Sequence, residues 1–310
     1  EISLGLVGSE MCIRDRDYMK TLKYIMKTSA QKIFNVKFAT FCAAFLILSW
    51  TYDQPYLQFV KEKNYPISWC IFPFYMSSFG ILSIFYVGIV YIHSDVPFMQ
   101  HINMYQVIRT GRERWALSQI AGILIRSFFA VILSAIAAVL PFWGHIEFST
   151  DWGKVIKTLA SQRADEGFGF GMGQMLDFRF HYGILGKFTP VQLMIITVLI
   201  CTLICTFLGI LMFLISLYAG KILAVAVTMM SVVALFIVEN IYGEWKLIVA
   251  HVVPTYWAEV ALSATPVSGR YRIPSLTYIF TFLIVAVVFM SVIIFCKVKH
   301  TEFHWENEDA

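Results

Sequence analysis

Few ionisable side chains interrupt the long apolar stretches of this chain, and these few are the first candidates for functional residues. Arg126 lies about two helical turns inside one apolar stretch, and Glu239 ends another. A centrally placed arginine costs about 2.5–3.5 kcal/mol on insertion scales. We therefore treat Arg126 and Glu239 as candidate intramembrane or pathway residues. The alternatives are that Arg126 snorkels to the headgroups and that Glu239 caps its helix at the outer face.

The remaining reactive side chains form no catalytic pattern. His93, Asp95 and His101 can be read as metal ligands or as an ordinary polar helix end. Cys201 and Cys205 lie one helical turn apart and are read as packing residues, and the six cysteines show no disulfide or metal spacing. Phosphate-loop, zinc-protease and nucleophile-elbow motifs do not occur. We expect no catalytic residue, no bound cofactor, no metal and no enzyme activity in this chain.

The elements that position these residues are long apolar helices. The chain has 310 residues, of which 58% are hydrophobic and 14% charged, whereas soluble domains carry about 25% charge. A bilayer core requires about 20 apolar residues per helix, and the runs are continuous rather than alternating. The sequence predicts an all-α integral membrane protein with six transmembrane helices within residues 38–300. The expected spans are 38–52, 67–92, 118–142, 191–217, 222–238 and 275–296.

The two terminal segments differ from the rest of the chain. Residues 1–16 resemble translated sequencing-adaptor read-through, and we treat them as a non-native artefact. Residues 17–37 carry five lysines among apolar residues at helical spacing. This pattern predicts an amphipathic helix on the cytoplasmic face with its lysines toward anionic lipid, and the alternative is a basic tail. Residues 301–310 form an acidic tail.

Charge bias predicts the orientation of the helices. Lysine and arginine gather before the first span, between the second and third, between the fourth and fifth, and after the sixth. By the positive-inside rule, both termini are cytoplasmic. The segments 143–189 and 239–274 then face outward. The second of these is apolar in part but too short to cross, which predicts a re-entrant piece.

The break before the third span carries the most informative cytoplasmic pattern. Within residues 100–118 an apolar stripe precedes a glycine and a basic cluster. The stripe suits a short helix that docks against a partner, and the alternative is a solvated loop whose arginines only fix topology. The candidate coupling residues are Ile102, Tyr105, Ile108, Arg109, Arg112 and Arg114.

The architecture resembles the ABC-2 type permease subunits of bacterial ABC transporters. The resemblance covers about residues 18–300 and includes the stretch from Arg109 to Trp115 and the segment from Pro254 to Trp257. It implies a multi-pass protein of the bacterial cell membrane that exports a peptide, lipid or other amphipathic compound. It also implies a separate ATP-binding cassette subunit, which holds ATP and Mg²⁺, and a second permease chain, identical or paralogous.

Three other functions stay open at this point. An ion-coupled secondary transporter would bury ionisable residues near the midplane and often show repeats. An intramembrane enzyme would need a catalytic constellation within its spans. A non-transporting membrane anchor or immunity protein has no distinguishing sequence feature. Nucleic acid is not an expected partner, because the basic residues are dispersed along the chain.

Overall fold

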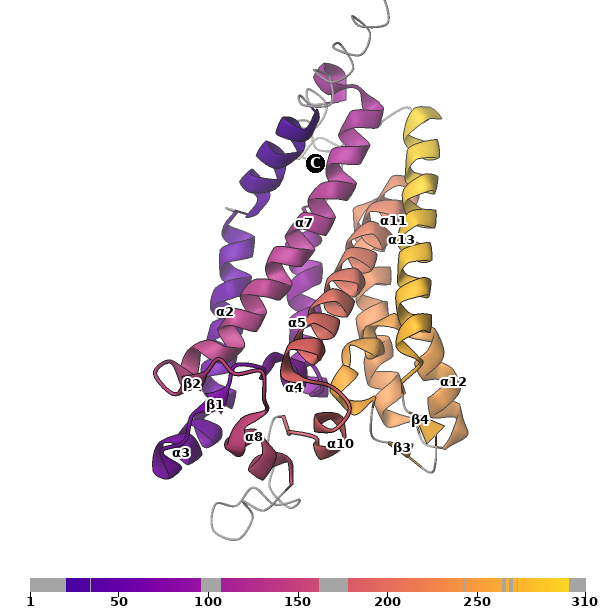
Figure 1. Ribbon diagram of the computed structural model, residues 1–310. Coiled ribbons are helices and arrows are strands. Elements are labelled where there is room, and N and C mark those ends of the chain that lie inside the picture. The colour runs from indigo at the N-terminus through magenta and orange to yellow at the C-terminus, as the bar shows by residue number, and fades with distance from the viewer. Residues whose placement is uncertain are drawn as a thin grey trace, which may run out of the picture.

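The computed structural model describes residues 21–33, 35–95, 107–161, 178–241, 243–263, 266–267, 270–271 and 273–300 (Figure 1). These residues are mostly helical, which confirms the all-α prediction. The long helices are α2 (Val36–Tyr52), α5 (Phe79–His93), α7 (Arg112–Val139), α11 (Pro190–Asn240) and α13 (Leu276–His300). The shorter helices are α3 (Gln54–Lys63), α4 (Phe72–Tyr75), α8 (Gly153–Ala160), α10 (Tyr182–Leu185) and α12 (Glu244–Val252), with 3-10 turns η1 (Leu140–Phe142), η2 (Pro254–Ala258) and η3 (Val260–Leu262).

Two small sheets complete the secondary structure. Strand β1 (Ile67–Ser68) pairs in parallel with β2 (Ile146–Glu147). Strand β3 (Pro266–Val267) pairs antiparallel with β4 (Arg270–Tyr271). Both sheets lie beyond the long helices (Figure 1), and the β1–β2 pair joins the segment before α4 to the segment after α7, whereas β3 and β4 lie in the same connection before α13.

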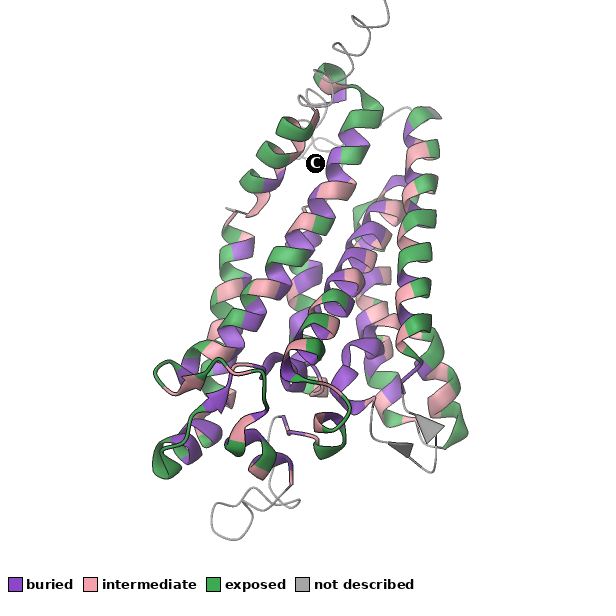
Figure 2. Cartoon of the chain, viewed as in Figure 1, coloured by how far each residue is buried: buried purple, intermediate pink, exposed green. Residues whose placement is uncertain are grey.

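Length and apolarity make this chain a membrane protein. Three helices in the described residues are long and apolar enough to cross a bilayer, over Arg112–Phe142, Pro190–Asn240 and Leu276–Lys299. The helix Thr21–Ile33 and α2 meet at 53° and together would make a fourth. On α13 the exposed apolar residues recur at helical spacing, as expected of a face in contact with lipid (Figure 2). They include Val285, Phe289 and Val292.

Helix α11 holds the fourth and fifth predicted spans as two arms. Its first arm begins with a capping box, in which the backbone nitrogen of Gln192 donates to the Thr189 hydroxyl. Pro190 occupies the first turn. At Gly220 the backbone adopts φ 79° and ψ 178°, which breaks the helix. Figure 1 shows the second arm running back beside the first. The gap between the predicted fourth and fifth spans, residues 218–221, therefore coincides with the observed break.

The predicted helix over 67–92 is shorter in the structure. Residues 67–68 form β1, α4 covers only one turn, and the helix proper is α5. Pro73 lies in the first turn of α4, where proline begins a helix, so it explains why no helix extends back over residues 67–71. The break between α4 and α5 follows at residues 76–78. With 15 residues, α5 is roughly 22 Å long, less than a hydrocarbon core of about 30 Å.

The bundle has two different ends. We call the end where α7 begins and α13 finishes the basic end, and the opposite end the loop end (Figure 1). The α11 hairpin also reaches the basic end, where the Lys297 ammonium lies 4.6 Å from the centre of the Tyr218 ring. The loop end holds α3, α8, α10 and α12. The basic segments that flank alternate predicted spans thus gather at one end of the molecule.

The segment after α11 folds back into the bundle from the loop end. Residues of η2 and η3 are buried, and the Thr255 hydroxyl donates to the Ser231 carbonyl, midway along the second arm of α11 (2.9 Å). The Trp257 indole donates to the Ala250 carbonyl of α12 (2.7 Å). The residues of η2 and η3 are thus buried among protein, which is the environment that the predicted re-entrant piece would require.

Candidate functional site

A stripe of polar and small residues runs along α7. Gln119, Gly122 and Arg126 recur at intervals of three and four residues, so they share one face of the helix. The N-terminal helix packs on this face, and Ser127 beside it faces α5. We call the residues that meet here the polar cluster: Ser29, Lys32, His93, Gln119, Gly122, Arg126 and Ser127.

Arg126 is held inside the protein rather than at its surface. Its side chain is 1% exposed, so the snorkelling interpretation is wrong for this residue. The guanidinium Nε donates to the Gly122 carbonyl (3.3 Å), and Nη1 makes a long contact with the Ile92 carbonyl (3.5 Å). That carbonyl belongs to the last turn of α5, the negative end of the helix dipole, where a cation is favoured.

His93 lies beside this arginine and is also buried. Its Nε2 atom lies 3.1 Å from the Ser127 hydroxyl, which links α5 to α7. Helix α11 closes the cluster from the other side at Gly209. A Cβ atom added to Gly209 would lie 3.2 Å from the His93 ring and 2.5 Å from Ile123. Glycine is required at this position because α11 approaches both α5 and α7 so closely.

Two of the lysines predicted to face lipid, Lys32 and Lys37, point inward instead, whereas Lys23 and Lys27 are exposed. Lys32 donates from its ammonium to the Gln119 side chain of α7 (2.6 Å), and Lys37 forms an ion pair with Asp95. Asp95 also accepts a hydrogen bond from Asn35 (3.0 Å). The described part of the predicted amphipathic helix, Thr21–Ile33, therefore packs against α7 through Lys32, and Lys37 in the first turn of α2 pairs at the end of α5.

Glu239, the second predicted pathway residue, lies apart from the polar cluster. It is part-buried near the end of α11, and its carboxylate pairs with the Lys246 ammonium of α12 at 2.6 Å. A pair of this exposure contributes about 0–1 kcal/mol to stability. The arrangement joins α11 to α12 at the loop end and corresponds to the helix-end interpretation rather than to a buried pathway residue.

The predicted coupling residues fall in two groups. Ile102 and Tyr105 lie outside the described residues, as does His101. Ile108, Arg109, Arg112 and Arg114 are exposed at the basic end. Arg112 and Arg114 lie in the first turn of α7, because Gly111 at φ 82° starts that helix earlier than the predicted third span.

At the basic end, contacts between side chains hold the start of α7 against the end of α13. Val107 is buried against a cluster that includes Trp115 and Val298, whereas the neighbouring Ile108 is 68% exposed. Arg112 donates to the Lys299 carbonyl (3.4 Å), and the Lys299 ammonium lies 3.1 Å from the Glu113 carboxylate. These contacts fasten the start of α7 to the end of α13. We call the exposed residues here the coupling surface: Ile108, Arg109, Arg112, Arg114 and Lys299.

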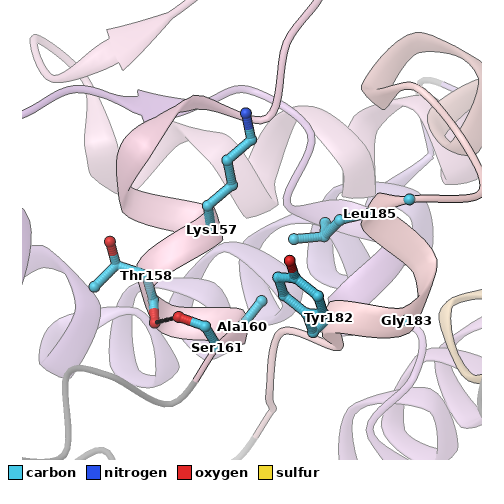
Figure 3. Close-up of a pocket in the computed structure, with 8 residues that line it drawn as sticks. Lys157, Thr158, Ala160, Ser161, Tyr182, Gly183 and Leu185 are labelled. Atoms are coloured by element: carbon cyan, nitrogen blue, oxygen red, sulfur yellow. Dashed lines mark hydrogen bonds between the residues drawn. The ribbon is translucent and has the colours of Figure 1, made fainter.

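A cavity of about 920 Å³ opens at the loop end between α8 and α10 (Figure 3). Its lining combines one amine, that of Lys157, with the Tyr182 phenol and small residues. The Thr158 and Ser161 hydroxyls donate within α8 itself. Residues 167–173, a glycine-rich part of the predicted outward segment 143–189, lie outside the described residues.

Two buried carboxylic acids near the loop end were missed by sequence reasoning. Asp53 follows α2 directly, and burial raises the pKa of its carboxyl to about 8, with the nearby Tyr75 hydroxyl opposing that rise. Glu259 lies between η2 and η3 and acts electrostatically on the Tyr86 hydroxyl of α5. Both residues lie in short segments next to long apolar runs, and the sequence of such segments does not indicate whether a carboxylate is buried.

Lys32, His93 and Ser127 were missed as members of an internal site as well. The spacing of Gln119, Gly122 and Arg126 was a detectable signal, since a polar stripe on an apolar helix marks a face turned toward protein. Among the described residues, no three His, Cys, Asp or Glu side chains are grouped to hold a metal ion. Comparisons with family models, curated proteins and solved structures give no match, so the site is interpreted from its own residues.

Proposed function

We propose that this chain is the membrane-spanning permease subunit of an ATP-driven exporter. The observation that carries the proposal is the coupling surface, where an exposed isoleucine stands among arginines on a segment fastened to both α7 and α13. Protein interfaces are enriched in arginine, and an exposed apolar side chain among arginines suits a docking site for a soluble partner. Movement of that partner would act directly on two long helices.

The arrangement of the remaining elements supports the same proposal. The six predicted apolar spans would correspond to α2, α5, α7, the two arms of α11 and α13. The basic end would then be cytoplasmic and the loop end external, with the re-entrant η2–η3 segment entering from outside. Two such chains would form the pathway for a peptide, lipid or other amphipathic compound in the bacterial cell membrane.

Cysteine labelling in intact cells tests this topology. In a background without the native cysteines, an impermeant reagent is expected to label a cysteine placed at Ser161 and to leave one at Thr110 unlabelled. Both positions belong to the described residues, at the loop end and the basic end respectively. Labelling at Thr110 alone would reverse the orientation and remove the coupling surface from the side where ATP is found.

Co-purification from native membranes tests the partner. The wild-type chain is expected to carry a vanadate-sensitive ATPase, and Ile108→Asp is expected to lose it. Val252→Asp, at an equally exposed position on the loop end, is the matched control and should retain the ATPase. Arg112→Ala should have little effect, because exposed ion pairs contribute only about 0–1 kcal/mol. Retention of the ATPase by Ile108→Asp would contradict the role of this surface.

A second candidate function is ion-coupled transport, which the buried ionisable residues favour. Asp53, His93, Arg126 and Glu259 are enclosed in the protein, and buried titratable groups are typical of gradient-driven carriers. Reconstitution of the purified chain into vesicles separates the two functions. Transport that follows a proton or sodium gradient without ATP would establish the second candidate and refute the first.

A further inference from the structure

A groove of about 320 Å³ lies between the last turns of α7 and the first turns of α11. Its wall on α7 includes Ile132, Ala135 and Val139, which recur at intervals of three and four residues and so share one face of the helix. Its wall on α11 consists of Met194 and Val198, which lie one turn apart. Ala135 has the smallest side chain in the lining, so the groove is hollow at this position.

The groove is apolar and opens on the lipid-facing surface of α7. None of its lining residues, all of them described, has a charged side chain or a hydroxyl. Two of them, Ile136 and Leu140, are 54% and 39% exposed and continue the exposed apolar face of this helix. A polar ligand would leave its hydrogen bonds unsatisfied here. The lining therefore fits a hydrocarbon, and the surrounding bilayer supplies one.

The length of the groove matches one leaflet of a bilayer. From Ile132 to Leu140 the helix rises about 12 Å, and half of a hydrocarbon core is roughly 15 Å thick. These residues form the last turns of the apolar span Arg112–Phe142. A chain lying along the groove would thus follow the direction of the neighbouring lipid chains and remain within the leaflet on the loop-end side.

Aromatic side chains form the rim of the groove at the loop end. Trp143 and Phe148 are 79% and 82% exposed, although both are large apolar residues. The Trp69 indole donates to the Ser149 carbonyl (3.2 Å), which holds its ring in position beside them. Tryptophan is enriched at the level of lipid headgroups. The rim lies next to β2, where α7 leaves the bundle (Figure 1).

We propose that the groove binds one hydrocarbon chain of a membrane phospholipid, whose headgroup lies at the aromatic rim of Trp69, Trp143 and Phe148. Lipid tails are as apolar as the lining, so exclusion from water gives no preference for this site. Retention comes instead from van der Waals contacts on several sides of the chain. The groove should therefore select the chain and not the headgroup. The proposal requires neither an ATPase nor a given orientation, so it can fail without the proposed function.

Native mass spectrometry of the full chain, released from detergent, tests the site with phosphatidylcholine and phosphatidylglycerol of identical chains. The wild-type protein is expected to retain one phospholipid of either kind. Ala135→Phe should lower the affinity for both about tenfold, which corresponds to about 1.4 kcal/mol, because the ring fills the groove. The matched control is Leu133→Phe, which adds the same ring at an exposed position of α7 outside the groove.

A variant on the other wall decides the matter if Ala135→Phe does not fold. Val198→Phe narrows the groove from α11 at a half-buried position and should also lower retention. Its control is Leu199→Phe, at the neighbouring exposed position outside the groove. Unchanged retention in both Ala135→Phe and Val198→Phe would overturn the proposal.

Tryptophan fluorescence shows where the chain lies. Bromine quenches indole emission on contact, so phosphatidylcholine brominated on one acyl chain should quench the emission that Trp69→Phe lacks. Val198→Phe should protect Trp69 from this quenching. Failure of the brominated chain to quench Trp69 would place the retained lipid elsewhere and overturn the proposal.

A second copy of this chain is the alternative occupant of the groove. Chemical cross-linking of the purified protein measures the oligomeric state of the same variants. A wild-type dimer that retains no lipid, and that Val198→Phe converts to a monomer, would assign the groove to an interface between copies. That result would overturn the lipid site, as would a wild-type monomer that retains no lipid.

Discussion

The His93 ring nitrogen Nε2 and the Ser127 hydroxyl oxygen lie 3.1 Å apart and join the last turn of α5 to the middle of α7. Both side chains are buried, so water cannot replace either partner. A polar link at the end of α5 fixes how this helix sits against α7. The strength of this link can be measured by removing one oxygen atom.

Ser127→Ala is expected to lower the free energy of unfolding by about 1–3 kcal/mol, the cost of leaving a buried polar group without a partner. The measurement is a denaturing-detergent titration of the purified protein. Ser134→Ala is the control on the same helix, because the Ser134 hydroxyl is buried and makes no hydrogen bond within the described residues. Equal losses from both substitutions would show that the His93 contact contributes nothing.

Gly209→Ala is expected to destabilise the bundle, because its new Cβ would lie 2.5 Å from the Ile123 side chain. Overpacking of this kind costs about 1–3 kcal/mol. Gly80→Ala in α5 is the control, since nothing lies within 4 Å of the added atom.

A double-mutant cycle shows whether the clash at Gly209 has the stated cause. Ile123→Ala removes the methyl group that the new Cβ would meet, so the double variant should be more stable than the sum of the two losses predicts. Strict additivity of Gly209→Ala and Ile123→Ala would mean that the destabilisation arises elsewhere, for example at the His93 ring.

Much of the helical layout was predictable because a helix that spans a bilayer requires a long apolar stretch, and such a stretch is visible in the local sequence. The start of α11 at Pro190 and its break at Gly220 follow from residues that act on their own backbone. The interruption between α4 and α5 was missed because apolarity continues through this region. Local composition therefore located apolar stretches better than it located helix ends.

The polar cluster was largely beyond prediction for a different physical reason. Whether Lys32 or His93 faces lipid, water or protein depends on how the N-terminal helix and α5 pack on α7, and this packing joins residues distant in sequence. The alternatives considered for Arg126 had the same origin, since a depth along a helix does not specify a direction around it. Only the spacing of Gln119, Gly122 and Arg126 carried that directional information.

Gly220→Ala is expected to destabilise the α11 hairpin, because φ 79° with ψ 178° is a conformation that essentially only glycine adopts. The expected cost is about 1–3 kcal/mol, measured as a lower melting temperature in detergent. Gly186→Ala is the matched control, with ordinary backbone angles and open space around the added atom. A melting temperature equal to that of Gly186→Ala would show that the hairpin relaxes without strain.

Asp53 predicts a pH dependence of stability that one substitution should remove. Burial raises the pKa of its carboxyl to about 8, above the unfolded value of about 3.9. The folded protein therefore holds a proton that the unfolded chain releases, and stability falls as pH rises from about 4 through about 8. Asp53→Asn, which stays neutral, should be progressively more stable than the wild type across this range and level off above it.

Melting temperatures between about pH 5 and pH 9 measure this difference. Each pKa unit corresponds to about 1.4 kcal/mol, so the difference should be readily detectable at the upper end. Tyr75→Phe is the companion variant, because the Tyr75 hydroxyl opposes the rise in the Asp53 pKa, and its loss should move the transition to higher pH. If the difference in melting temperature between Asp53→Asn and the wild type were the same at every pH, the Asp53 carboxyl would not be enclosed. The packing of α2 against α4 would then differ from that described above.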